Sequence, residues 1–393
     1  MKRICLITPN LLPVPNVLGG AIETIVTNIV KEQEKEKKIV LTVVSIYNKD
    51  AKLESKKYLH TNFIYIKKDL KYLFYGFIFK TVNFIFKKDL NTYNHIVLKK
   101  IKKMKFDYVF AEGGNYNSFN EYLKHFSKDQ MVLHLHHTGT SNEIIDNTFS
   151  KIVGVSDYVL KKFKSTSKIN EYYLLKNCID ISCFDNILLK SDKEQLYKKY
   201  SLSSKDFIIM YCGRLIKEKG VFELINAFNN IHINNIKLLI IGSVNFGLGG
   251  EDNYTSLLNQ VAKDNSNIIF TGYINPNELY KYYQLSNVVI IPSRWEEAAG
   301  LVCIEAMASK KVIITTGSGG IKEYVNDYSK IVSNDDDKIV DEITNAINDL
   351  YKNRHNLNKI GKINYQEAQK YSTKNYYNNF VQLIEEDMDN EKK

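Results

Sequence analysis

The chain has 393 residues, which is too long for one ordinary hydrophobic core and long enough for two α/β domains. Its 44% hydrophobic and 25% charged residues are typical of a soluble globular protein. The formal charge of +10 makes nucleic acid or an anionic membrane a candidate partner. The five cysteines are an odd number without framework spacing, which argues for a reducing cytosol and against disulfides. No signal peptide is expected, because the short apolar stretch at the N-terminus is a predicted strand.

The first half of the chain alternates predicted strands and helices. Strands are expected near residues 3–8, 40–46, 62–66, 107–111, 131–135, 151–155 and 172–176. Helices are expected near residues 22–35, 71–86, 92–104, 117–125 and 157–163. Strands separated by helices imply a parallel sheet with helices on both faces.

The second half repeats this alternation after a polar, charged stretch from Ile181 to Lys205, which contains a predicted helix at 192–200. Its strands are expected near residues 207–212, 236–241, 267–270, 287–291 and 311–315. Its helices are expected near residues 221–231, 254–263, 277–284, 301–308 and 320–326, and the tail from 337 to 387 is predicted to be helical. The pattern predicts a second parallel sheet.

A basic and aromatic segment lies between Lys67 and Lys105. It holds eleven lysines and two aspartates, and this excess of nine accounts for most of the whole-chain excess of ten. Its apolar runs, Tyr72–Phe79 and Phe84–Phe86, are too short to span a bilayer, which needs about 20 residues. Lysines interleaved with aromatic side chains favour a helix in the plane of the lipid headgroups, and an ordinary helix pair with a basic outer face is the alternative. Nucleic acid is not an expected partner, because no nucleic-acid motif accompanies the charge.

Glu297 and Glu305 belong to a segment that begins at Pro292, directly after a predicted strand. The segment turns at Gly300 and leads into a predicted helix, so backbone N–H groups and the helix dipole there attract anions. Carboxylates beside such a turn suit sugar hydroxyls, because an ionised carboxylate accepts strong, directed hydrogen bonds. A solvated acidic turn followed by an ordinary helix-start glutamate is the alternative.

Two other strand-end turns carry residues suited to phosphate. Arg214 and Lys219 follow a predicted strand and stand beside Gly213, where two cations can clamp a diphosphate and neutralise a leaving nucleoside diphosphate. Gly19 and Gly20 follow the first predicted strand, where glycine lets a backbone approach a phosphate closely. Taken alone, each turn is also compatible with solvated surface.

Three histidines fall within four residues at the end of a predicted strand. His134 and His136 would share one face of the strand, with His137 on the other. A metal site is not expected, because no carboxylate or cysteine completes an obvious ligand set, and Cys178 and Cys183 have no second pair. A plain buried-strand motif is the alternative.

Together these motifs resemble those of the retaining glycosyltransferases of family four. The matching residues run in the family's order over roughly residues 1–330, and they are Gly19-Gly20-Ala21, Gly213-Arg214 with Lys219-Gly220, the pair Glu297 and Glu305, and Gly319-Gly320 with Glu323. The paired-glutamate motif and its flanks are highly specific, and the Gly-Arg…Lys-Gly motif is moderately specific. The chain departs from the family at Ala299, where phenylalanine is common, and at Cys178, where glycine is common. Neither departure removes a group with an expected chemical role.

The resemblance implies the GT-B fold, an α/β architecture of two Rossmann-like doubly wound domains that face a central cleft. The expected first domain covers residues 1–185 and lies on the acceptor side. The expected second domain covers residues 186–370 and binds the nucleotide sugar. The C-terminal helix, about 371–387, is expected to cross back onto the first domain.

The resemblance also implies roles for individual residues. Arg214 and Lys219 would hold the diphosphate with help from the Gly20 backbone, Glu297 would hold the sugar hydroxyls, and Glu305 would hold the ribose. The whole donor set is Gly19, Gly20, Arg214, Lys219, Glu297, Ala299, Gly300, Leu301 and Glu305. His136 would hydrogen-bond the donor sugar near the reacting centre, which makes the expected catalytic set His136, Glu297, Arg214 and Lys219. His137 and Glu112 are assigned to the acceptor side.

The implied reaction is retaining transfer of a hexose from a UDP- or GDP-sugar to a lipid-linked or surface-polysaccharide glycan at the cytoplasmic membrane face. No residue is a convincing nucleophile on the sugar face, so a front-face route is preferred to the two-carboxylate glycosidase scheme. No cofactor and no metal are expected, because Arg214 and Lys219 would replace a divalent ion. Asp335, Asp336 and Asp337 are assigned to a solvated loop. The expected partners are the nucleotide sugar, the acceptor glycan and an anionic membrane surface, and the oligomeric state is left open.

Two other functions fit the same architecture. A sugar-nucleotide epimerase would lack a bulky acceptor site, and the basic aromatic segment argues against it. A non-catalytic sugar-nucleotide-binding partner of a transferase would not need intact charged pairs, and the pairs Glu297/Glu305 and Arg214/Lys219 argue against it.

Overall fold

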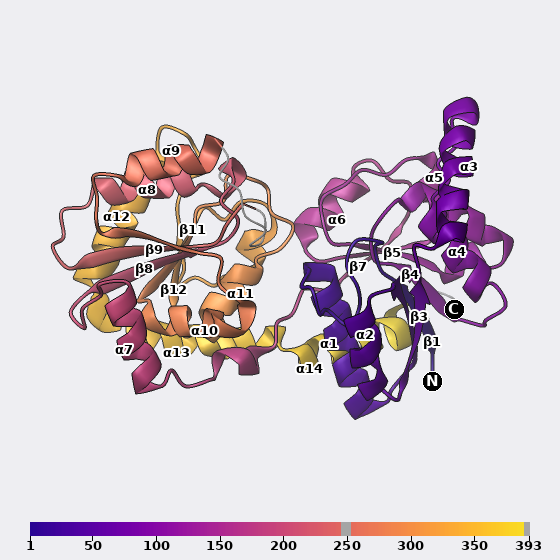
Figure 1. The fold of residues 1–393 in the computed structure, drawn as a ribbon, viewed down its shortest axis with the longest axis horizontal. Helices are drawn as coiled ribbons and strands as arrows, with labels where there is room; N and C mark the ends of the chain where they lie inside the picture. The colour runs from indigo at the N-terminus through magenta and orange to yellow at the C-terminus, as the bar shows by residue number, and fades with distance from the viewer. Residues whose placement is uncertain (245–252, 389–393) are drawn as a thin grey trace. The chain divides into compact units, whose positions relative to one another are not determined.

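The computed structural model describes residues 1–244 and 253–388, without the side chains of residues 386 and 387. The chain forms two compact units, a first unit of Met1–Cys178 with Thr373–Lys393 and a second unit of Ile179–Ser372. Each unit is built around one parallel β-sheet covered by helices (Figure 1). The predicted α/β class with two Rossmann-like domains is confirmed.

The sheet of the first unit has the strand order β3-β2-β1-β4-β5-β6-β7, and every neighbouring pair is parallel. The strands are β1 Arg3–Ile7, β2 Val40–Ile46, β3 Thr61–Ile66, β4 Tyr108–Ala111, β5 Met131–Leu135, β6 Lys151–Gly154 and β7 Glu171–Leu174. The strand order reverses between β1 and β4, which is the position where open parallel sheets bind ligands.

Helices of the first unit cover both faces of this sheet. They are α1 Ala21–Glu36, α2 Lys49–Glu54, α3 Leu70–Phe86, α4 Thr92–Ile101, α5 Glu143–Thr148, α6 Asp157–Lys164 and α14 Thr373–Gln382. On one face Ile4 and Leu6 of β1 pack in one buried cluster with Ile25 and Ile29 of α1. The alternation of every second residue toward this cluster is the period expected of a strand buried on both sides.

The sheet of the second unit has the order β10-β9-β8-β11-β12-β13 and is also parallel. Its strands are β8 Phe207–Cys212, β9 Ile236–Ile241, β10 Ile268–Gly272, β11 Val288–Ile291, β12 Val312–Thr315 and β13 Lys330–Ile331. Its helices are α7 Lys190–Lys199, α8 Val221–Asn229, α9 Asn253–Ala262, α10 Pro276–Leu285, α11 Leu301–Ala308, α12 Ile339–Lys352 and α13 Leu357–Ala368.

This second sheet separates two hydrophobic clusters. Ile209 of β8 points into a cluster with residues of α8, α9 and α12. Its neighbour Met210 points the other way, into a cluster with residues of α10, α11 and α13. The run Val288–Ile291 is apolar throughout, and Val312–Thr315 is apolar up to its last residue, because both faces of these strands are covered.

Most predicted elements are found within a residue or two of their expected positions, and the differences are local. The predicted helices near 117–125 and 320–326 are 3-10 helices, Tyr116–Lys124 and Gly320–Tyr324. The short elements α2, α5 and β13 were not predicted. They are too short to show a helical or strand period, and α5 is instead defined by its cap, since the Asn142 side chain accepts hydrogen bonds from Ile144 N and Ile145 N.

The units divide at Cys178/Ile179 and at Ser372/Thr373, whereas the expected boundaries were at residues 185/186 and near 371. Ile179 and Ile181 belong to the second unit because both side chains pack into its core. The backbone N–H of Ile179 also donates to the carbonyl of Tyr371, 3.0 Å away, within that unit.

The C-terminal helix α14 completes the core of the first unit. Tyr376, Tyr377 and Phe380 are at most 2% exposed and join the cluster of β1, β4 and α1. The Phe380 ring lies 5.5 Å from the Phe110 ring between their centroids. The Tyr377 hydroxyl donates to Gln33 Oε1 on α1. Residues far apart in the sequence therefore share one core.

We predict that Phe380→Ala destabilises the first unit by about 3–5 kcal/mol, because it removes a buried aromatic ring and leaves a cavity. Hydrogen exchange measured by mass spectrometry should show faster exchange in β1 and β4 but not in β8 and β11. The exposed neighbour Asn379 provides the control, since Asn379→Ala should leave both units unchanged. Equal protection of β1 in the Phe380 variant and the wild type would contradict this account.

Candidate functional site

The predicted donor residues of the second unit lie at one edge of its sheet. Arg214 and Lys219 follow β8, and Glu297 follows β11. Glu305 is in α11, the helix that begins after the same loop. Because the strands are parallel, their carboxyl ends share one edge, where ligands of open α/β sheets bind.

The loops after β8 and β11 are joined through their backbones. The Glu218 carbonyl accepts hydrogen bonds from Arg294 N at 2.8 Å and from Trp295 N at 3.1 Å. Gly220 lies against the same loop with φ of 71°, and a β-carbon there would come within 1.9 Å of the Pro292 carbonyl oxygen. Only glycine fits this left-handed, close-packed position. The geometry of one loop therefore depends on the other.

The loop after β12 is fixed to the loop after β11 in the same way. Gly320 N donates to the Glu297 carbonyl at 2.7 Å, and Glu297 forms an isolated bridge with Gly319. The hydroxyls of Thr316 and Ser318 both donate to the Ser293 carbonyl, at 2.7 and 2.9 Å. The loop after β12 therefore holds the backbone at both Ser293 and Glu297.

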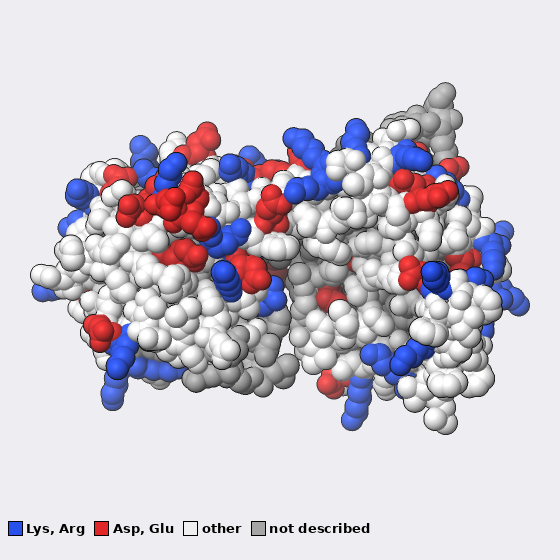
Figure 2. All heavy atoms as spheres, turned by 90° about the horizontal axis from the view of Figure 1, so that it is seen from above, with Lys and Arg blue, Asp and Glu red and all other residues white. Residues whose placement is uncertain are grey.

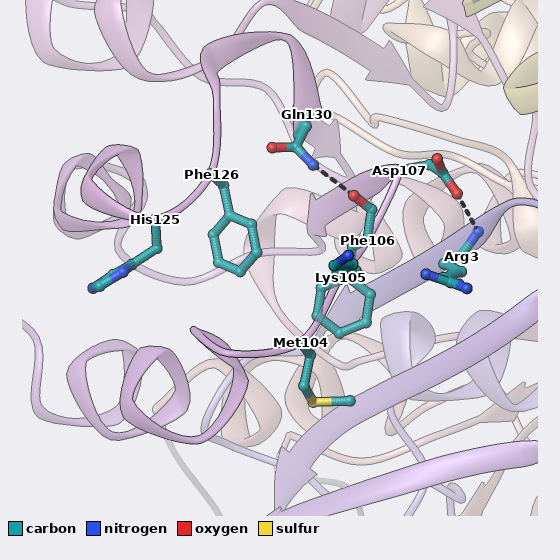
Figure 3. Close-up of a pocket in the computed structure, with 8 residues that line it drawn as sticks. All are labelled: Arg3, Met104, Lys105, Phe106, Asp107, His125, Phe126 and Gln130. Atoms are coloured by element: carbon teal, nitrogen blue, oxygen red, sulfur yellow. Dashed lines mark hydrogen bonds between the residues drawn. The ribbon is translucent and has the colours of Figure 1, made fainter.

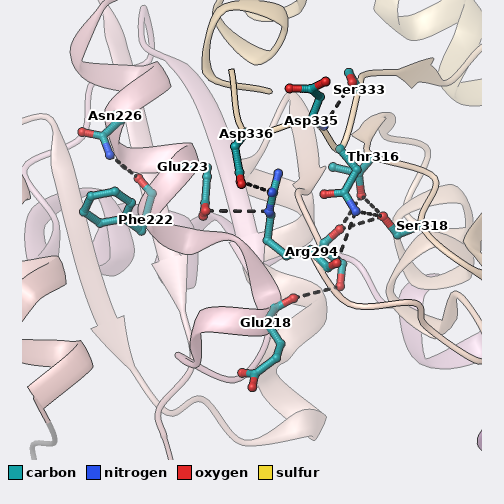
Figure 4. A network of polar contacts seen from close by, with 12 residues as sticks. Glu218, Phe222, Glu223, Asn226, Arg294, Thr316, Ser318, Ser333, Asp335 and Asp336 are labelled. Atoms are coloured by element: carbon teal, nitrogen blue, oxygen red, sulfur yellow. Dashed lines mark hydrogen bonds and ion pairs between the residues drawn. The ribbon is translucent and has the colours of Figure 1, made fainter. Parts of the chain in front are cut away.

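The side chain of Arg294 pairs with acidic groups beside these loops. Its guanidinium pairs with Asp336 and lies 3.8 Å from Glu223 Oε1 through Nε (Figure 4). Asp335–Asp337 are exposed and lie outside helices and strands, as expected for a solvated loop, and the 88% exposed carboxylate of Asp336 also pairs with Arg294.

Lys219 and Glu297 form an ion pair at the centre of this edge. Lys219 Nζ contacts Glu297 Oε1, and the Ser293 hydroxyl donates to the same oxygen at 2.6 Å. Their side chains are 26% and 19% exposed, so the pair is partly shielded from water. The structure thus brings together two of the four expected catalytic residues.

Arg214 is an exposed cation beside this pair. Within the described residues the structure shows no ion pair to its guanidinium, and its carbonyl accepts a hydrogen bond from the Tyr211 hydroxyl at 2.8 Å. Burial raises the pKa of Tyr211, and the charges of Glu297 and Arg214 act on it in opposite directions. Both charges therefore lie near one buried phenol, and Arg214 presents its charge to solvent.

Glu305 has a different partner from Glu297. The Tyr283 hydroxyl donates to Glu305 Oε2 at 2.8 Å. Burial raises the pKa of Glu305 to about 7, against the smaller opposing effect of the Tyr283 hydrogen bond. The two glutamates still belong to one site, because burial and the negative charges of both raise the pKa of Cys303.

The start of α11 presents donors between the two glutamates. Gly300 is the N-cap and supplies no side-chain hydrogen bond to the helix. Among the described residues, the N–H groups of Ala299, Gly300 and Leu301 have no hydrogen-bond partner. The first N–H groups of a helix are suited to anions and hydroxyl oxygens.

In the first unit, the predicted glycines stand just before α1. Gly20 is the N-cap of α1, with φ of 99°, and a β-carbon there would lie 2.1 Å from Glu23 Oε2. Gly19 has φ of 83° and open space around it. Burial raises the pKa of Glu23, the acidic residue in the first turn of α1.

A buried cluster of a carboxylate and two imidazoles lies at the carboxyl ends of β4 and β5. Glu112 Oε2 is 2.8 Å from His134 Nδ1 and 2.8 Å from His136 Nε2. The side chains of Glu112 and His134 are 1% exposed and that of His136 is 6% exposed. His134 and His136 share one face of the strand, as expected for residues two apart.

This cluster is the group of described residues that could hold a metal ion, since its three ligand atoms lie within 4.8 Å of one another. The sequence argument that no carboxylate completes a ligand set was wrong, because Glu112 lies beside both histidines. The 2.8 Å separations are hydrogen-bond distances, and the donors of a tetrahedral ion would lie roughly 3.4 Å apart at ordinary metal–ligand lengths. Hydrogen bonding accounts for the observed arrangement.

The two residues assigned to the acceptor side differ in exposure. Glu112 is buried, so its carboxylate does not reach solvent. His137 is exposed and its ring stacks on Tyr116 with centroids 6.2 Å apart. Burial lowers the pKa of His137.

A pocket of about 370 Å³ opens at the opposite, amino end of the first sheet (Figure 3). It is lined by residues next to the starts of β1, β4 and β5, which are Arg3, Met104, Lys105, Phe106, Asp107, His125, Phe126 and Gln130. The Arg3 N–H donates to Asp107 Oδ2 at 2.7 Å on its wall. None of the predicted site residues lines it, so its size does not make it the functional site.

Two residues of the site were not foreseen, Ser293 and Tyr283, which contact the two glutamates. Glu112 was expected on the acceptor side, but its contact with the two histidines was not expected. Tyr283 lies 22 residues before Glu305, and no local pattern marks that contact.

Comparison with known proteins adds to this geometry. Residues 192–365 match the model of the family described as glycosyl transferases group 1. Over 99% of its length the chain is 24% identical to the lipopolysaccharide 1,2-N-acetylglucosaminetransferase of Salmonella typhimurium, of which it covers 99%.

Two solved structures share the fold over nearly the whole chain. A glycosyltransferase from Rickettsia africae superposes with a TM-score of 0.76 at 18% identity, covering 99% of both chains. The Anabaena protein HepE, in complex with UDP and glucose, superposes with a TM-score of 0.72 at 15% identity, covering 98% of this chain and 99% of its own. The second unit therefore contains a glycosyl transferases group 1 domain, and the two-unit architecture is the GT-B fold.

Proposed function

We propose that the protein is a retaining glycosyltransferase that moves a hexose from a UDP- or GDP-sugar to a lipid-linked or surface-polysaccharide glycan. The observation that carries the proposal is the Lys219–Glu297 pair at the strand ends of a group 1 domain, with exposed Arg214 on the adjoining loop. Cations for a diphosphate and a carboxylate for hydroxyls are the groups that sugar transfer needs at one edge.

In this proposal Lys219 changes partners when the donor binds. Without the donor, Glu297 neutralises Lys219. A diphosphate held by Arg214 and Lys219 would draw the ammonium away and leave Glu297 free to accept hydrogen bonds from the sugar. Ser293 would keep the carboxylate in place, because its hydroxyl donates to Oε1 at 2.6 Å. The free N–H groups of Ala299 to Leu301 would supply the remaining donors.

Glu305 would hold the ribose hydroxyls and His136 a hydroxyl of the transferred sugar. Arg214 and Lys219 would carry the charge of the leaving diphosphate, so the reaction would need no metal ion. We favour the front-face route over a covalent intermediate, because Glu297 is assigned to the sugar hydroxyls and no other described residue is assigned as a nucleophile on the sugar face.

The proposed acceptor is inferred from the name of a relative and from an exposed surface of the first unit. The Salmonella relative is named for lipopolysaccharide, and a glycan of that lipid-linked kind is proposed for this chain. The described residues contain no helix that is both long enough and apolar enough to cross a bilayer. Contact with a membrane-borne acceptor would then depend on a surface element.

Helix α3 is the surface element that fits. It stands out from the rest of the first unit (Figure 1). Most of its exposed apolar side chains recur at helical spacing along one face, and these are Leu70, Leu73, Phe74, Phe77, Phe84 and Ile85, whereas exposed Phe86 lies outside this face. On the opposite face Phe79 is buried against His95 of α4, with ring centroids 4.9 Å apart. The exposed stripe has no partner within the described residues, as expected for a helix that lies in a lipid interface.

Lysines border this stripe. Lys71 and Lys80 flank it, and Lys67, Lys68 and Lys87 stand near its two ends. Elsewhere on the face drawn in Figure 2, basic side chains are interspersed with acidic ones. We therefore propose that α3 binds an anionic membrane surface, which would place the enzyme peripherally at the cytoplasmic face.

The two alternatives make different products. An epimerase would convert a nucleotide sugar without releasing nucleoside diphosphate, and a non-catalytic partner would bind the sugar nucleotide without consuming it. Incubation of the purified protein with a panel of nucleotide sugars, with nucleoside diphosphate release as the readout, separates all three.

Arg214→Ala should reduce nucleoside diphosphate release by about 10²–10³, because one donor to the developing charge of the leaving group is lost. Lys217→Ala, in the same loop and equally exposed, is the matched control and should retain near-normal turnover. Excess EDTA should leave the wild-type rate unchanged. Normal turnover in the Arg214 variant would remove the diphosphate role, and loss in EDTA restored by manganese would remove the metal-independent route.

Glu305→Gln should change how stability depends on pH. The folded carboxyl has a pKa of about 7 and the unfolded one about 4.5, so the folded state binds the proton more tightly. The stability from this group is present below about pH 4.5 and is lost as pH rises through about 7. Glutamine resembles the neutral acid and does not ionise. The free energy of unfolding of the variant should therefore rise relative to that of the wild type between pH 4.5 and 8, by at most about 3 kcal/mol.

Urea unfolding of the second unit at several pH values measures this difference. The control is Glu218→Gln, which changes an exposed carboxylate of the same unit. If the gap between wild type and Glu305→Gln were the same at pH 5 and pH 8, the raised pKa of Glu305 would be refuted.

The membrane proposal predicts that the protein co-sediments with vesicles containing anionic lipid and is released by salt. Replacing Phe77 and Phe84 by serine should abolish binding, and Lys71→Glu with Lys80→Glu should weaken it by roughly 1 kcal/mol per lysine or more. Leu59→Ser, at an 83% exposed apolar residue outside α3, is the control. Donor hydrolysis should persist in all variants. Salt-insensitive binding, equal on neutral and anionic vesicles, would contradict the proposal.

A further inference from the structure

The cluster of Glu112, His134 and His136 restricts which chemical group of a ligand can hydrogen-bond to His136. Glu112 lies just after β4, and its N–H donates to the Ile7 carbonyl of β1 at 3.0 Å. His134 is in β5 and His136 follows it. Three neighbouring parallel strands therefore hold the carboxylate and the two imidazoles in place.

Glu112 is ionised at neutral pH. Burial alone would favour the neutral acid, but the His134 charge and hydrogen bonds from both imidazoles together lower the pKa of Glu112 to about 2. An ionised carboxylate is only an acceptor of hydrogen bonds. Each imidazole nitrogen 2.8 Å from Glu112 Oε2 must therefore carry a hydrogen, namely Nδ1 of His134 and Nε2 of His136.

His136 has a second nitrogen that remains available. A neutral imidazole carries one hydrogen, so with Nε2 protonated its Nδ1 has a lone pair. Burial and the neighbouring His134 lower the pKa of His136 to about 4, which outweighs the opposing effect of Glu112 and keeps the ring neutral at pH 7. Within the described residues the structure shows no hydrogen bond to this Nδ1. The atom is also absent from the fully buried polar atoms without a partner, so it is accessible from outside the protein.

We infer that Glu112 is a positioning residue that fixes His136 in the Nε2–H tautomer, so that Nδ1 offers a hydrogen-bond acceptor to a sugar hydroxyl and not a donor to an anion. The inference rests on the proposed function, because it names the group that meets the ligand at His136. His134 is the second donor to Glu112 and keeps the carboxylate oriented, as outer partners of functional histidines generally do.

This arrangement separates two kinds of ligand group. A phosphate or carboxylate oxygen would face a lone pair with the buried negative charge of Glu112 behind it, which is unfavourable. A hydroxyl can donate to the same lone pair. The titratable groups around the ring are Glu112, His134 and exposed His137, and Tyr116 adds a phenol whose pKa is raised by burial and by Glu112. The described groups around the ring thus include no lysine or arginine that would reverse this selection.

The test reads the tautomer directly. Protein labelled with 15N in its eight histidines gives imidazole spectra in which each nitrogen reports whether it is protonated, and His136 is assigned by comparison with His136→Asn. At pH 7 the wild type should show His136 protonated at Nε2 and unprotonated at Nδ1. Protonation of His136 at Nδ1, or at both nitrogens, would overturn the inference, as would one tightly bound metal ion per chain by elemental analysis.

Glu112→Gln then tests the consequence. The amide can donate as well as accept, so His136 should become a mixture of tautomers, and donor hydrolysis should fall by roughly tenfold or more. Nucleotide affinity, followed by fluorescence of Trp295, the single tryptophan of the chain, should stay within about twofold of the wild type. Glu121→Gln is the matched control, because Glu121 contacts His95 at 3.2 Å in the same unit and should alter only that ring.

A changed tautomer with unchanged hydrolysis in Glu112→Gln would overturn the positioning role. Failure of the proposed function would be distinguishable from this, because the wild type would then release no nucleoside diphosphate from any nucleotide sugar. The tautomer spectrum does not depend on turnover and would still give its own answer.

Discussion

Parallel strand pairing is the constraint on which this structure depends. A parallel ladder cannot be closed by a hairpin, so consecutive strands are joined by crossover connections, which place helices over both faces of the sheet. The same pairing brings all the carboxyl ends of one sheet to one edge. Residues far apart in sequence, such as Lys219 and Glu297, meet there. The strand order of the sheet therefore determines where the site lies.

The loops at that edge are held to one another by backbone contacts as well as by side chains. The Glu218 carbonyl serves two N–H groups of the next loop, and Gly220 packs against Pro292. Because loops of this kind are already ordered, they position charged side chains with little loss of conformational entropy when a ligand binds. In the first unit, a buried carboxylate between two imidazoles holds the site side chains in place.

The fold was largely predictable because its strands are continuous apolar runs and its helices are long enough to show their period. Runs such as Phe207–Cys212 and the turns after them were identified from the sequence alone. Individual partners were not, because side-chain contacts across the sheet leave no local pattern. The Lys219–Glu297 pair, the Tyr283–Glu305 hydrogen bond and the burial of Glu112 all depend on strand order, which the sequence does not state.

The first unit is built from both ends of the chain, with the second unit inserted between them. During synthesis, residues 1–178 leave the ribosome long before α14 exists to cover their sheet. The second unit has all of its strands and helices by residue 372 and can fold while the first still waits. The half-finished sheet of the first unit must therefore remain soluble for the time needed to translate about half of the protein. A chaperone that binds nascent chains would find its binding surface there, on the face that Tyr376, Tyr377 and Phe380 later occupy.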